Sequence, residues 1–466
     1  ENFPKQPISV ICESPDQTLL IGIDGKGVWE MDKEKKAIVN LYNEDIDNPY
    51  SLRGNGVYDI YCDNNRRVWV VTYSGGLSYF DWKQTNINNI SHKINSINSL
   101  GNNDVNSVIE DSKGDLWFAT NNGIYRWIVA SDKWESYYKN KEDDAQVFQT
   151  LCEDDENRIW AGTYSSGFYI LDRDRGSEIA HYPNSNTPNI SSCKFVMNIY
   201  KDSDGDMWIG GVQNLICYSK QKREFRVYDS QPMRSFMEFS QGKILLACTY
   251  CLILLDKESG KITYLKECLA QDIVVKENDI WVATSGDGLI YYNYKTKETY
   301  KITTEAGLPS NFVNSLIYDN DYLWVGTESG LCKYNIKGNY IENSYNNQAF
   351  SGTSFNHSSV CKLRSGKLIW GSNNGALMFT PNVSDGSKIE GKLFYQNISI
   401  AGKSIREDDK LLKGVVVNEQ TDLKFKSDQN TFSLDLLPIG LSSNEVKLSW
   451  IMYGLDSNWS APSNQQ

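Results

Sequence analysis

The chain has 466 residues, of which 40% are hydrophobic and 12% aromatic. This apolar content is enough for packed cores and excludes a disordered chain. The 47 basic and 59 acidic residues leave a net charge of −12, which argues against a surface for nucleic acid or for an anionic membrane. No apolar stretch reaches the length of a membrane span, so we expect neither a nucleic-acid partner nor a transmembrane segment in this region.

One sequence pattern recurs along most of the chain, at intervals of roughly 35 to 50 residues, which is the range of a propeller blade. Residues 111–127 read DSKGDLWFATNNGIYRW, and residues 319–334, DNDYLWVGTESGLCKY, repeat that order closely. Nine copies align, and their equivalent positions hold Leu20, Trp69, Trp117, Trp160, Trp208, Leu245, Trp281, Trp324 and Ile369. This repetition predicts a series of similar structural units.

Each copy predicts four antiparallel strands. In the third copy, an alternating run at 105–111 is followed by a turn rich in Asp and Gly and by a second strand at 116–120. Runs at 123–127 and 133–138 supply the third and fourth strands. We therefore predict an all-β fold of propeller blades, with the recurring Trp wedged between neighbouring blades. Small residues two positions after the Trp suit a close contact between sheets: Ala119, Gly162, Gly210, Ala283 and Gly326.

The number of copies predicts the domain organisation. Propellers usually have four to eight blades, so we assign the last seven copies, residues 100–381, to a seven-bladed β-propeller. Residues 1–99 are then two blades of a preceding, truncated propeller. Residues 382–466 lack the repeat and predict an Ig-like β-sandwich, which we expect to be incomplete at its C-terminus. Its strand-like runs lie at 392–405, 422–428, 431–439 and 446–459.

The ten cysteines are scattered, and only Cys248 and Cys251 have CxxC spacing. A zinc ribbon needs a second such pair and a thioredoxin-like site needs a βαβ context, so we expect no metal and no cofactor. Buried, unpaired strand cysteines are the favoured interpretation, with an occasional disulfide as the alternative.

Two motifs resemble a known family. The pattern D-x-x-G-x-L-W-x-G-T-x-x-G-L, seen with small departures at 111–124 and 319–331, resembles the two-component regulator propeller repeat. The segment YGLDSNW at 453–459 resembles the G-x-D-x-x-W core of the Y_Y_Y sandwich that follows such propellers. Gly454, Asp456 and Trp459 match that core, whereas Leu448 and Trp450 stand where the domain usually has tyrosines.

This resemblance implies the periplasmic sensor region of a hybrid two-component system that controls polysaccharide utilisation. In that family two seven-bladed propellers precede the sandwich, and a membrane helix leads to a cytoplasmic histidine kinase and response regulator. The implied ligand is an oligosaccharide breakdown product, and the implied location is the periplasm, as the ectodomain of an inner-membrane protein. We also expect a homodimer formed through the sandwich.

The sequence does not predict catalytic residues. His92, His181 and His357 lie in or beside three different inter-blade loops, without the clustered His and carboxylate of a lyase. Acidic residues recur at the same turn position of several copies, which indicates turn formation, whereas glycosidase chemistry needs two facing carboxylates. These residues are Asp111, Asp154, Asp202 and Asp319. A scaffold for protein partners and, less favoured, a propeller lyase or glycosidase remain the alternatives.

A ligand is expected on the face where the copies differ from one another. In a propeller, the loops between second and third strands emerge on the same face as the loops that lead to the next blade, and variable loops suit binding. Sugars are bound by aromatic rings together with amides, carboxylates and Arg. The candidate ligand-binding residues of these types are Tyr73, Asn121, Asn122, Tyr138, Tyr164, Gln213, Arg234, Asp287, Glu328, Phe355, His357, Asn373 and Asn374.

Overall fold

The structure is a computed structural model, and it divides into two compact units, each described by itself below. The larger unit comprises described residues of 45–51 and 84–382, and the smaller unit those of 1–44, 52–83 and 383–466. The residues that the structure describes are 4–46, 51–63, 66–82, 87–93, 96, 98–139, 147–184, 187, 190, 193–212, 214–342, 353–381, 392–405, 425–427, 429–439, 448–456 and 460.

The described residues of the larger unit form seven four-stranded antiparallel sheets, which we call blades 1 to 7. Blade 1 contains β9 (Val105–Glu110), β10 (Leu116–Thr120), β11 (Gly123–Ile128) and β12 (Lys133–Tyr137). Blade 2 contains β13 (Phe148–Glu153), β14 (Arg158–Thr163), β15 (Phe168–Asp172) and β16 (Glu178–Tyr182). Blade 3 contains β17 (Val196–Lys201), β18 (Met207–Gly211), β19 (Leu215–Ser219) and β20 (Glu224–Tyr228). Blade 4 contains β21 (Met233–Ser240), β22 (Lys243–Cys248), β23 (Cys251–Asp256) and β24 (Ile262–Glu267).

The remaining blades follow the same order. Blade 5 contains β25 (Ala270–Lys276), β26 (Asp279–Thr284), β27 (Leu289–Asn293) and β28 (Thr299–Ile302). Blade 6 contains β29 (Val313–Asp319), β30 (Tyr322–Thr327), β31 (Gly330–Asn335) and β32 (Tyr340–Glu342). Blade 7 contains β33 (Phe355–Lys362), β34 (Leu368–Ser372), β35 (Gly375–Phe379) and β8 (Ile87–Ile90). The single-turn 3₁₀ helices η1 (Val129–Ser131) and η4 (Thr304–Ala306) lie between strands.

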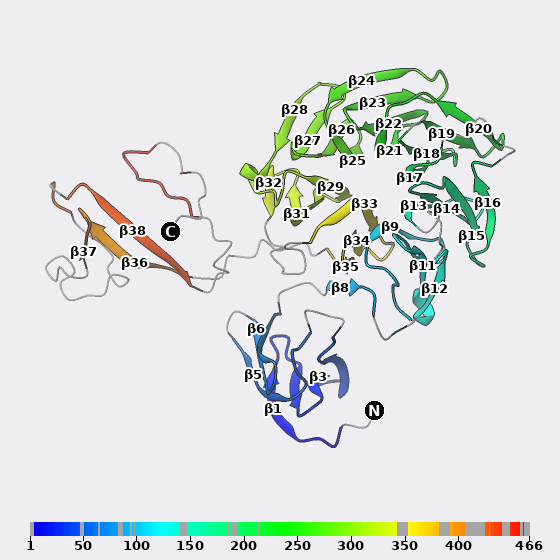
Figure 1. The fold of residues 1–466 in the computed structure, drawn as a ribbon. Helices are drawn as coiled ribbons and strands as arrows, with labels where there is room; N and C mark the ends of the chain where they lie inside the picture. Colours follow the sequence, from blue (N-terminus) through cyan, green and yellow to red (C-terminus); the bar gives the residue numbers. More distant parts are fainter. Residues whose placement is uncertain are drawn as a thin grey trace. The chain divides into compact units, whose positions relative to one another are not determined.

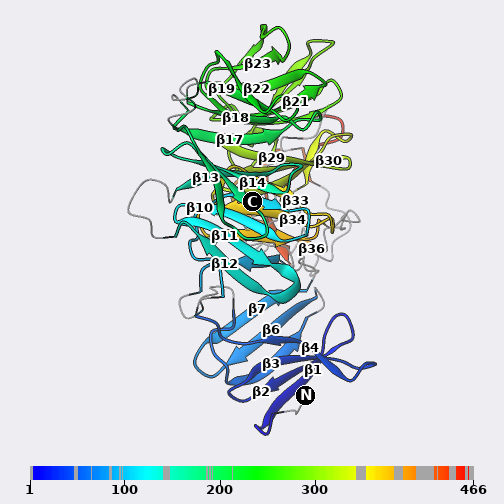
Figure 2. The ribbon, with the colours of Figure 1, turned by 90° about the vertical axis from the view of Figure 1, so that its right-hand side faces the viewer.

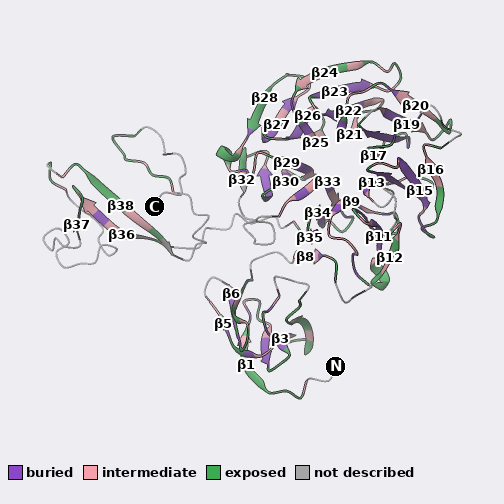
Figure 3. Ribbon diagram, viewed as in Figure 1, coloured by how far each residue is buried: buried purple, intermediate pink, exposed green. Residues whose placement is uncertain are grey.

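The seven blades close into a ring. The first strand of each blade lies at the centre and the fourth at the rim (Figure 1), and Figure 2 shows the same sheets from the side. The hydroxyl of Ser359 on β33 donates to the carbonyl of Val105 on β9 at 3.0 Å, which joins the last inner strand to the first. The second and third strands are mainly buried, whereas rim strands such as β28 are largely exposed (Figure 3). The predicted seven-bladed propeller is therefore confirmed.

One boundary of the sequence prediction is wrong. Residues 1–99 were assigned to the preceding propeller, but β8 pairs with β35, in the register Ile90 with Ala376, and so supplies the outer strand of blade 7. The strand that precedes blade 1 in the chain thus closes the ring with the last blade. This pairing joins segments far apart in sequence, which the local strand pattern does not report.

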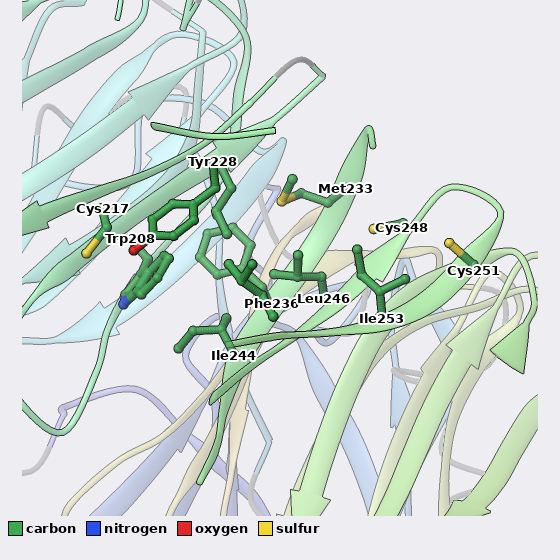
Figure 4. Close-up of a cluster of buried hydrophobic side chains, with 12 residues drawn as sticks. Trp208, Cys217, Tyr228, Met233, Phe236, Ile244, Leu246, Cys248, Cys251 and Ile253 are labelled. Carbon is green, nitrogen blue, oxygen red and sulfur yellow. The ribbon is translucent and has the colours of Figure 1, made fainter. Parts of the chain in front are cut away.

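The recurring Trp fills the space between neighbouring blades, as predicted. Trp160 is fully buried and belongs to a cluster that includes Val196 and Met207 of blade 3. In Figure 4, Trp208 and Tyr228 of blade 3 pack with Phe236 and other apolar side chains of blade 4. These contacts between blades are the main apolar core of the ring.

The small residue two positions after the recurring Trp is required because the next blade packs closely against it. A Cβ atom placed on Gly162 lies 2.5 Å from Val196 Cγ1 of blade 3, and one on Gly326 lies 2.8 Å from the indole nitrogen of Trp370 in blade 7. Both distances are shorter than a van der Waals contact, so a larger residue would push the blades apart.

The recurring Asp of the turn has a second role that the sequence did not indicate. Asp154 accepts hydrogen bonds from the backbone of Glu156 and Arg158, which shapes the turn, and also from the Trp160 indole at 2.7 Å. The same Asp–Trp bond occurs in three other copies at 2.8 to 2.9 Å: Asp63–Trp69, Asp111–Trp117 and Asp202–Trp208. The Asp therefore forms the turn and also orients the Trp.

The N-terminal part of the smaller unit contains two blades. One is β1 (Ile8–Glu13), β2 (Leu19–Ile23), β3 (Gly27–Asp32) and β4 (Ala37–Tyr42), and the other is β5 (Val57–Cys62), β6 (Arg67–Thr72) and β7 (Gly76–Asp81). Their facing sides share a core that includes Leu20, Val28 and Val68. On the opposite side of β6, Trp69 is half-buried, in contrast to its fully buried equivalents in the ring.

The C-terminal part contains a three-stranded antiparallel sheet in the order β37 (Lys403–Ser404), β36 (Lys392–Ile400) and β38 (Phe432–Ile439). These strands lie in the predicted runs 392–405 and 431–439. The backbone nitrogen of Met452 donates to the Asp456 carboxylate at 2.8 Å, so Asp456 forms a turn in the matched motif. Trp459 lies outside the described residues.

Candidate ligand-binding face

Two sets of loops of the ring are joined on one face, which we call the loop face. It consists of the loops between the second and third strands of each blade and the loops that lead into each first strand. The backbone nitrogen just after a second strand donates to a carbonyl just before the first strand of the same blade, as in Tyr164 to Val147 at 3.0 Å. The same bond joins Thr249 to Pro232, and Ser285 to Leu269. These hydrogen bonds hold the two sets of loops together on one face, as the sequence predicted.

Exposed apolar side chains gather on the loop face between blades 2 and 6. Tyr164 is 53% exposed and Tyr250 is 66% exposed, and both are large rings on loops after second strands. The other exposed apolar residues of this group are Phe195, Val212, Leu269 and Phe312. A soluble domain seldom leaves so many large apolar side chains uncovered on one face unless they meet a partner or ligand.

A groove lies within this group of side chains. It has a volume of about 290 Å³ and is lined by Tyr164, Phe195, Met197, Gly211, Val212, Pro232, Met233, Arg234 and Thr249. The Tyr164 and Phe195 rings meet edge to face, with centroids 5.7 Å apart. The groove therefore combines an aromatic wall with one cationic side chain. The sequence pattern did not predict Phe195 or Val212 as ligand-binding residues. For Phe195, the available signal was an aromatic residue just before a first strand.

The predicted ligand residues of the ring are spread over the loop face. Asn121, Glu328, Asn373 and Asn374 are exposed on it, and Asn122 is half-buried there. Asn121 accepts from Asn106 Nδ2 at 2.9 Å, and the half-buried Asp287 is paired with Lys301 at 2.8 Å. Of the predicted residues that the structure describes, only Tyr164 and Arg234 line the groove.

Two predicted residues are held in the ring itself. Phe355 was expected in a loop, but it is the first residue of β33 and is completely buried against Trp370, so it is not available to a ligand. Tyr138 packs on Tyr169 with ring centroids 4.9 Å apart, and its hydroxyl donates to Glu178 at 2.8 Å. Burial and this carboxylate raise the Tyr138 pKa above its ordinary value.

Two further predicted residues lie outside the described part of the larger unit. Tyr73 belongs to the smaller unit, where it is 77% exposed and its ring lies 5.7 Å from that of Tyr58. Gln213 lies outside the described residues.

The first strands are joined beneath the loop face by a buried carboxylate. Asp272 of β25 accepts from the hydroxyls of Ser235 at 2.8 Å and Ser358 at 3.0 Å, and from the backbone nitrogen of Leu316 at 2.9 Å. These donors come from blades 4, 7 and 6. Desolvation raises the Asp272 pKa to about 6, although the hydrogen bonds oppose this rise.

The raised Asp272 pKa predicts a pH-dependent stability. Between about pH 4 and 6 the folded state binds the proton that the unfolded state has released, so stability falls as the pH rises through this window. We expect wild type to lose on the order of 2–3 kcal/mol of unfolding free energy between pH 4 and 7 relative to Asp272→Asn, which stays neutral. Urea unfolding of both proteins at several pH values measures this difference, and parallel profiles would contradict it.

Matches to a family model cover five stretches of the chain: 51–74, 99–122, 142–165, 190–213 and 307–329. Each includes a first strand, the Asp-containing turn and a second strand, and the model describes the two-component regulator propeller. The chain contains two-component regulator propeller repeats. The family suggested by the repeat motif is therefore confirmed at the level of the repeats.

A histidine kinase and the extracellular domain of a two-component system are similar to this chain. The chain is 25% identical over 428 residues to histidine kinase P4 of Formosa agariphila, with 84% of this chain and 31% of that protein covered. It resembles the extracellular domain of a putative hybrid two-component system of B. thetaiotaomicron, with 18% identity, a TM-score of 0.67, and coverage of 100% of this chain and 69% of that one. The chain thus spans about a third of the length of the kinase.

A streptogramin B lyase structure is also similar, with 12% identity and a TM-score of 0.51. The match covers 65% of this chain and 99% of the lyase, so the similarity shows a shared propeller fold and carries no activity across. Among the described residues, no group of three or more His, Cys, Asp or Glu side chains is placed to hold a metal ion. Within the same residues, no helix is long and apolar enough to cross a membrane.

Proposed function

We propose that this chain is the extracytoplasmic sensor region of a hybrid two-component system, that it binds an oligosaccharide breakdown product on the loop face, and that it controls polysaccharide-utilisation genes. The proposal places the region in the periplasm as the ectodomain of an inner-membrane protein. The ligand favours one arrangement of propeller and sandwich, and the sandwich passes this bias to a membrane helix and a cytoplasmic kinase. Such a shift requires that the ligand bind one arrangement more tightly than the other.

The observation that carries the proposal is the exposed aromatic group on the loop face, with its groove of about 290 Å³. Aromatic rings stack on the apolar faces of sugars, and polar side chains at the edge orient the hydroxyls. The Tyr164 and Phe195 rings supply such a surface. The repeats and the named relatives support the sensor role, and the sugar ligand is inferred from the groove.

A thermal-shift screen against purified oligosaccharides tests this proposal. A ligand at 100 times its dissociation constant is expected to add about 2.7 kcal/mol of stability, without being consumed. Tyr164→Ala is expected to remove most of this gain, because it removes one ring of the groove. Tyr264→Ala is the matched control, since Tyr264 is 67% exposed on the rim strand β24, away from the loop face.

The outcomes separate three functions. Stabilisation by an oligosaccharide that is lost in Tyr164→Ala supports the sensor. Conversion of the sugar to products during the assay would favour a lyase or glycosidase. An absence of any shift across a broad panel would favour a scaffold for protein partners, because exposed apolar groups also occur at protein interfaces.

A further inference from the structure

The first strand of blade 7 has a longer bulge near the loop face than its equivalents. In β9, Val105 and Val108 pair with Thr120 and Phe118, so one additional residue is accommodated by a bulge. In β33, Phe355 and Val360 pair with Ser372 and Trp370. Opposite the same length of partner strand, this bulge therefore holds two residues more than the bulge of blade 1. The other first strands of the ring have the single-residue shift of β9 near the loop face.

Specific contacts hold this long bulge, which comprises Asn356, His357 and Ser358. Asn356 Nδ2 donates to the Val105 carbonyl at 2.9 Å, and the Ser358 hydroxyl donates to the buried Asp272 at 3.0 Å. Ser358 has a φ of 50°, in the left-handed region that non-glycine residues seldom adopt. Such strain is maintained only where surrounding contacts enforce it, and it is concentrated at functional sites.

His357 lies on this bulge and interacts electrostatically with Arg234 of β21, three blades away around the ring. His357 is exposed to solvent. Partial desolvation, together with the positive charge of Arg234, lowers the pKa of His357 below its ordinary value. The imidazole is therefore neutral at pH 7 and carries one N–H donor.

Arg234 has no carboxylate partner among the residues that the structure describes, although the protein has a net charge of −12. Three other arginines of the ring are paired: Arg126 with Asp115, Arg158 with Asp154 and Arg173 with Glu153. On β25, the first strand of blade 5, the side-chain oxygen of Gln271 is buried without a hydrogen-bond donor among the described residues. Arg234 is exposed and lines the groove, so its guanidinium is open to an anionic ligand, and the unsatisfied buried oxygen of Gln271 lacks a donor that a bound ligand can supply.

We propose that Arg234 and His357 form a subsite for the anionic group of an acidic oligosaccharide, either the carboxylate of a uronic acid or a sulfate ester. A guanidinium binds such planar or multi-oxygen anions through two parallel hydrogen bonds, and the imidazole N–H adds a third donor. The sugar ring then lies in the groove that Arg234 shares with Tyr164 and Phe195. This inference rests on the proposed function and names the chemical class of its ligand.

The test compares acidic and neutral forms of the same sugars. The probes are oligogalacturonides, their carboxyl-reduced forms, a sulfated galacto-oligosaccharide, its desulfated form and sodium sulfate, each titrated by calorimetry. We expect an acidic member to bind at least 10-fold more tightly than its neutral form, and Arg234→Gln to remove that preference. Arg234→Lys is expected to retain part of it. Lys295→Gln, an exposed cation in the turn between β27 and β28 on the opposite face, is the matched control and retains the preference.

The possible outcomes test the anionic subsite and the sensor proposal separately. The carboxylate and sulfate pairs distinguish the two sources of the anion, and binding of sodium sulfate alone with the same dependence on Arg234 also supports the subsite. A neutral oligosaccharide that binds equally well to wild type and Arg234→Gln would overturn the subsite and leave the sensor proposal intact. Failure of every sugar, acidic and neutral, to bind a wild-type protein that unfolds cooperatively would overturn both. The melting temperature of each variant without ligand shows that it is folded.

Discussion

Replacing Lys257 with methionine is expected to lower the unfolding free energy of the ring by about 3–5 kcal/mol. The Lys257 ammonium lies 2.6 Å from Asp202, 2.9 Å from Asp204 and 3.0 Å from Asp206, so one cation on blade 4 pairs with three carboxylates in a turn of blade 3. Burial by itself would lower the Lys257 pKa, but the three hydrogen-bonded carboxylates raise it above its ordinary value. The substitution leaves Asp202 charged, with a side chain that is 1% exposed.

Urea denaturation followed by tryptophan fluorescence measures this loss. Lys261→Met is the matched control, because Lys261 is exposed just before β24, and its effect is expected within about 0.5 kcal/mol of zero. Methionine keeps most of the aliphatic length of lysine, so a loss arises mainly from the carboxylates that are left without their cation. A loss below about 1 kcal/mol for Lys257→Met would show that the three aspartates are accommodated without the cation.

Trp160→Ala is the second substitution with a large expected effect, a loss of about 3–5 kcal/mol. The Trp160 side chain is fully buried, its ring stacks on Phe168 with centroids 5.6 Å apart, and it packs against apolar residues of blade 3. Alanine leaves a cavity between two blades and removes the indole donor from Asp154. The change therefore combines lost burial with a weakened turn.

Two comparisons separate these contributions. Trp160→Phe keeps most of the ring and loses the hydrogen bond to Asp154, so we expect a loss of about 1–2 kcal/mol. Trp69→Ala removes the equivalent Trp from a blade where it is only half-buried, and its effect on the transition of the smaller unit is expected to be smaller than that of Trp160→Ala on the ring. Equal losses for Trp160→Ala and Trp160→Phe would contradict a role for interblade burial.

Part of the candidate site was predictable from the sequence. The position of Tyr164 and the asparagines after second strands followed from the repeat, because these loops are where copies differ. Phe195 and Val212 complete the groove, but they became recognisable only when the ring brought the loops of blades 2, 3 and 4 together. Phe355 and His357 are only two positions apart, yet one is buried and the other exposed, because the long bulge of β33 separates their environments.

The sequence alone determined the blades, because each blade is built from local pairings of successive strands joined by short turns. The Asp of the turn, the Trp and the small residue after it all act within one blade or at its contact with the next, so they recur at every copy. Ring closure by β8, the bridge from Ser358 to Asp272 and the approach of Arg234 to His357 were decided by the tertiary structure. Each of these contacts joins residues that lie far apart in the sequence. A local sequence pattern contains no information about such long-range contacts.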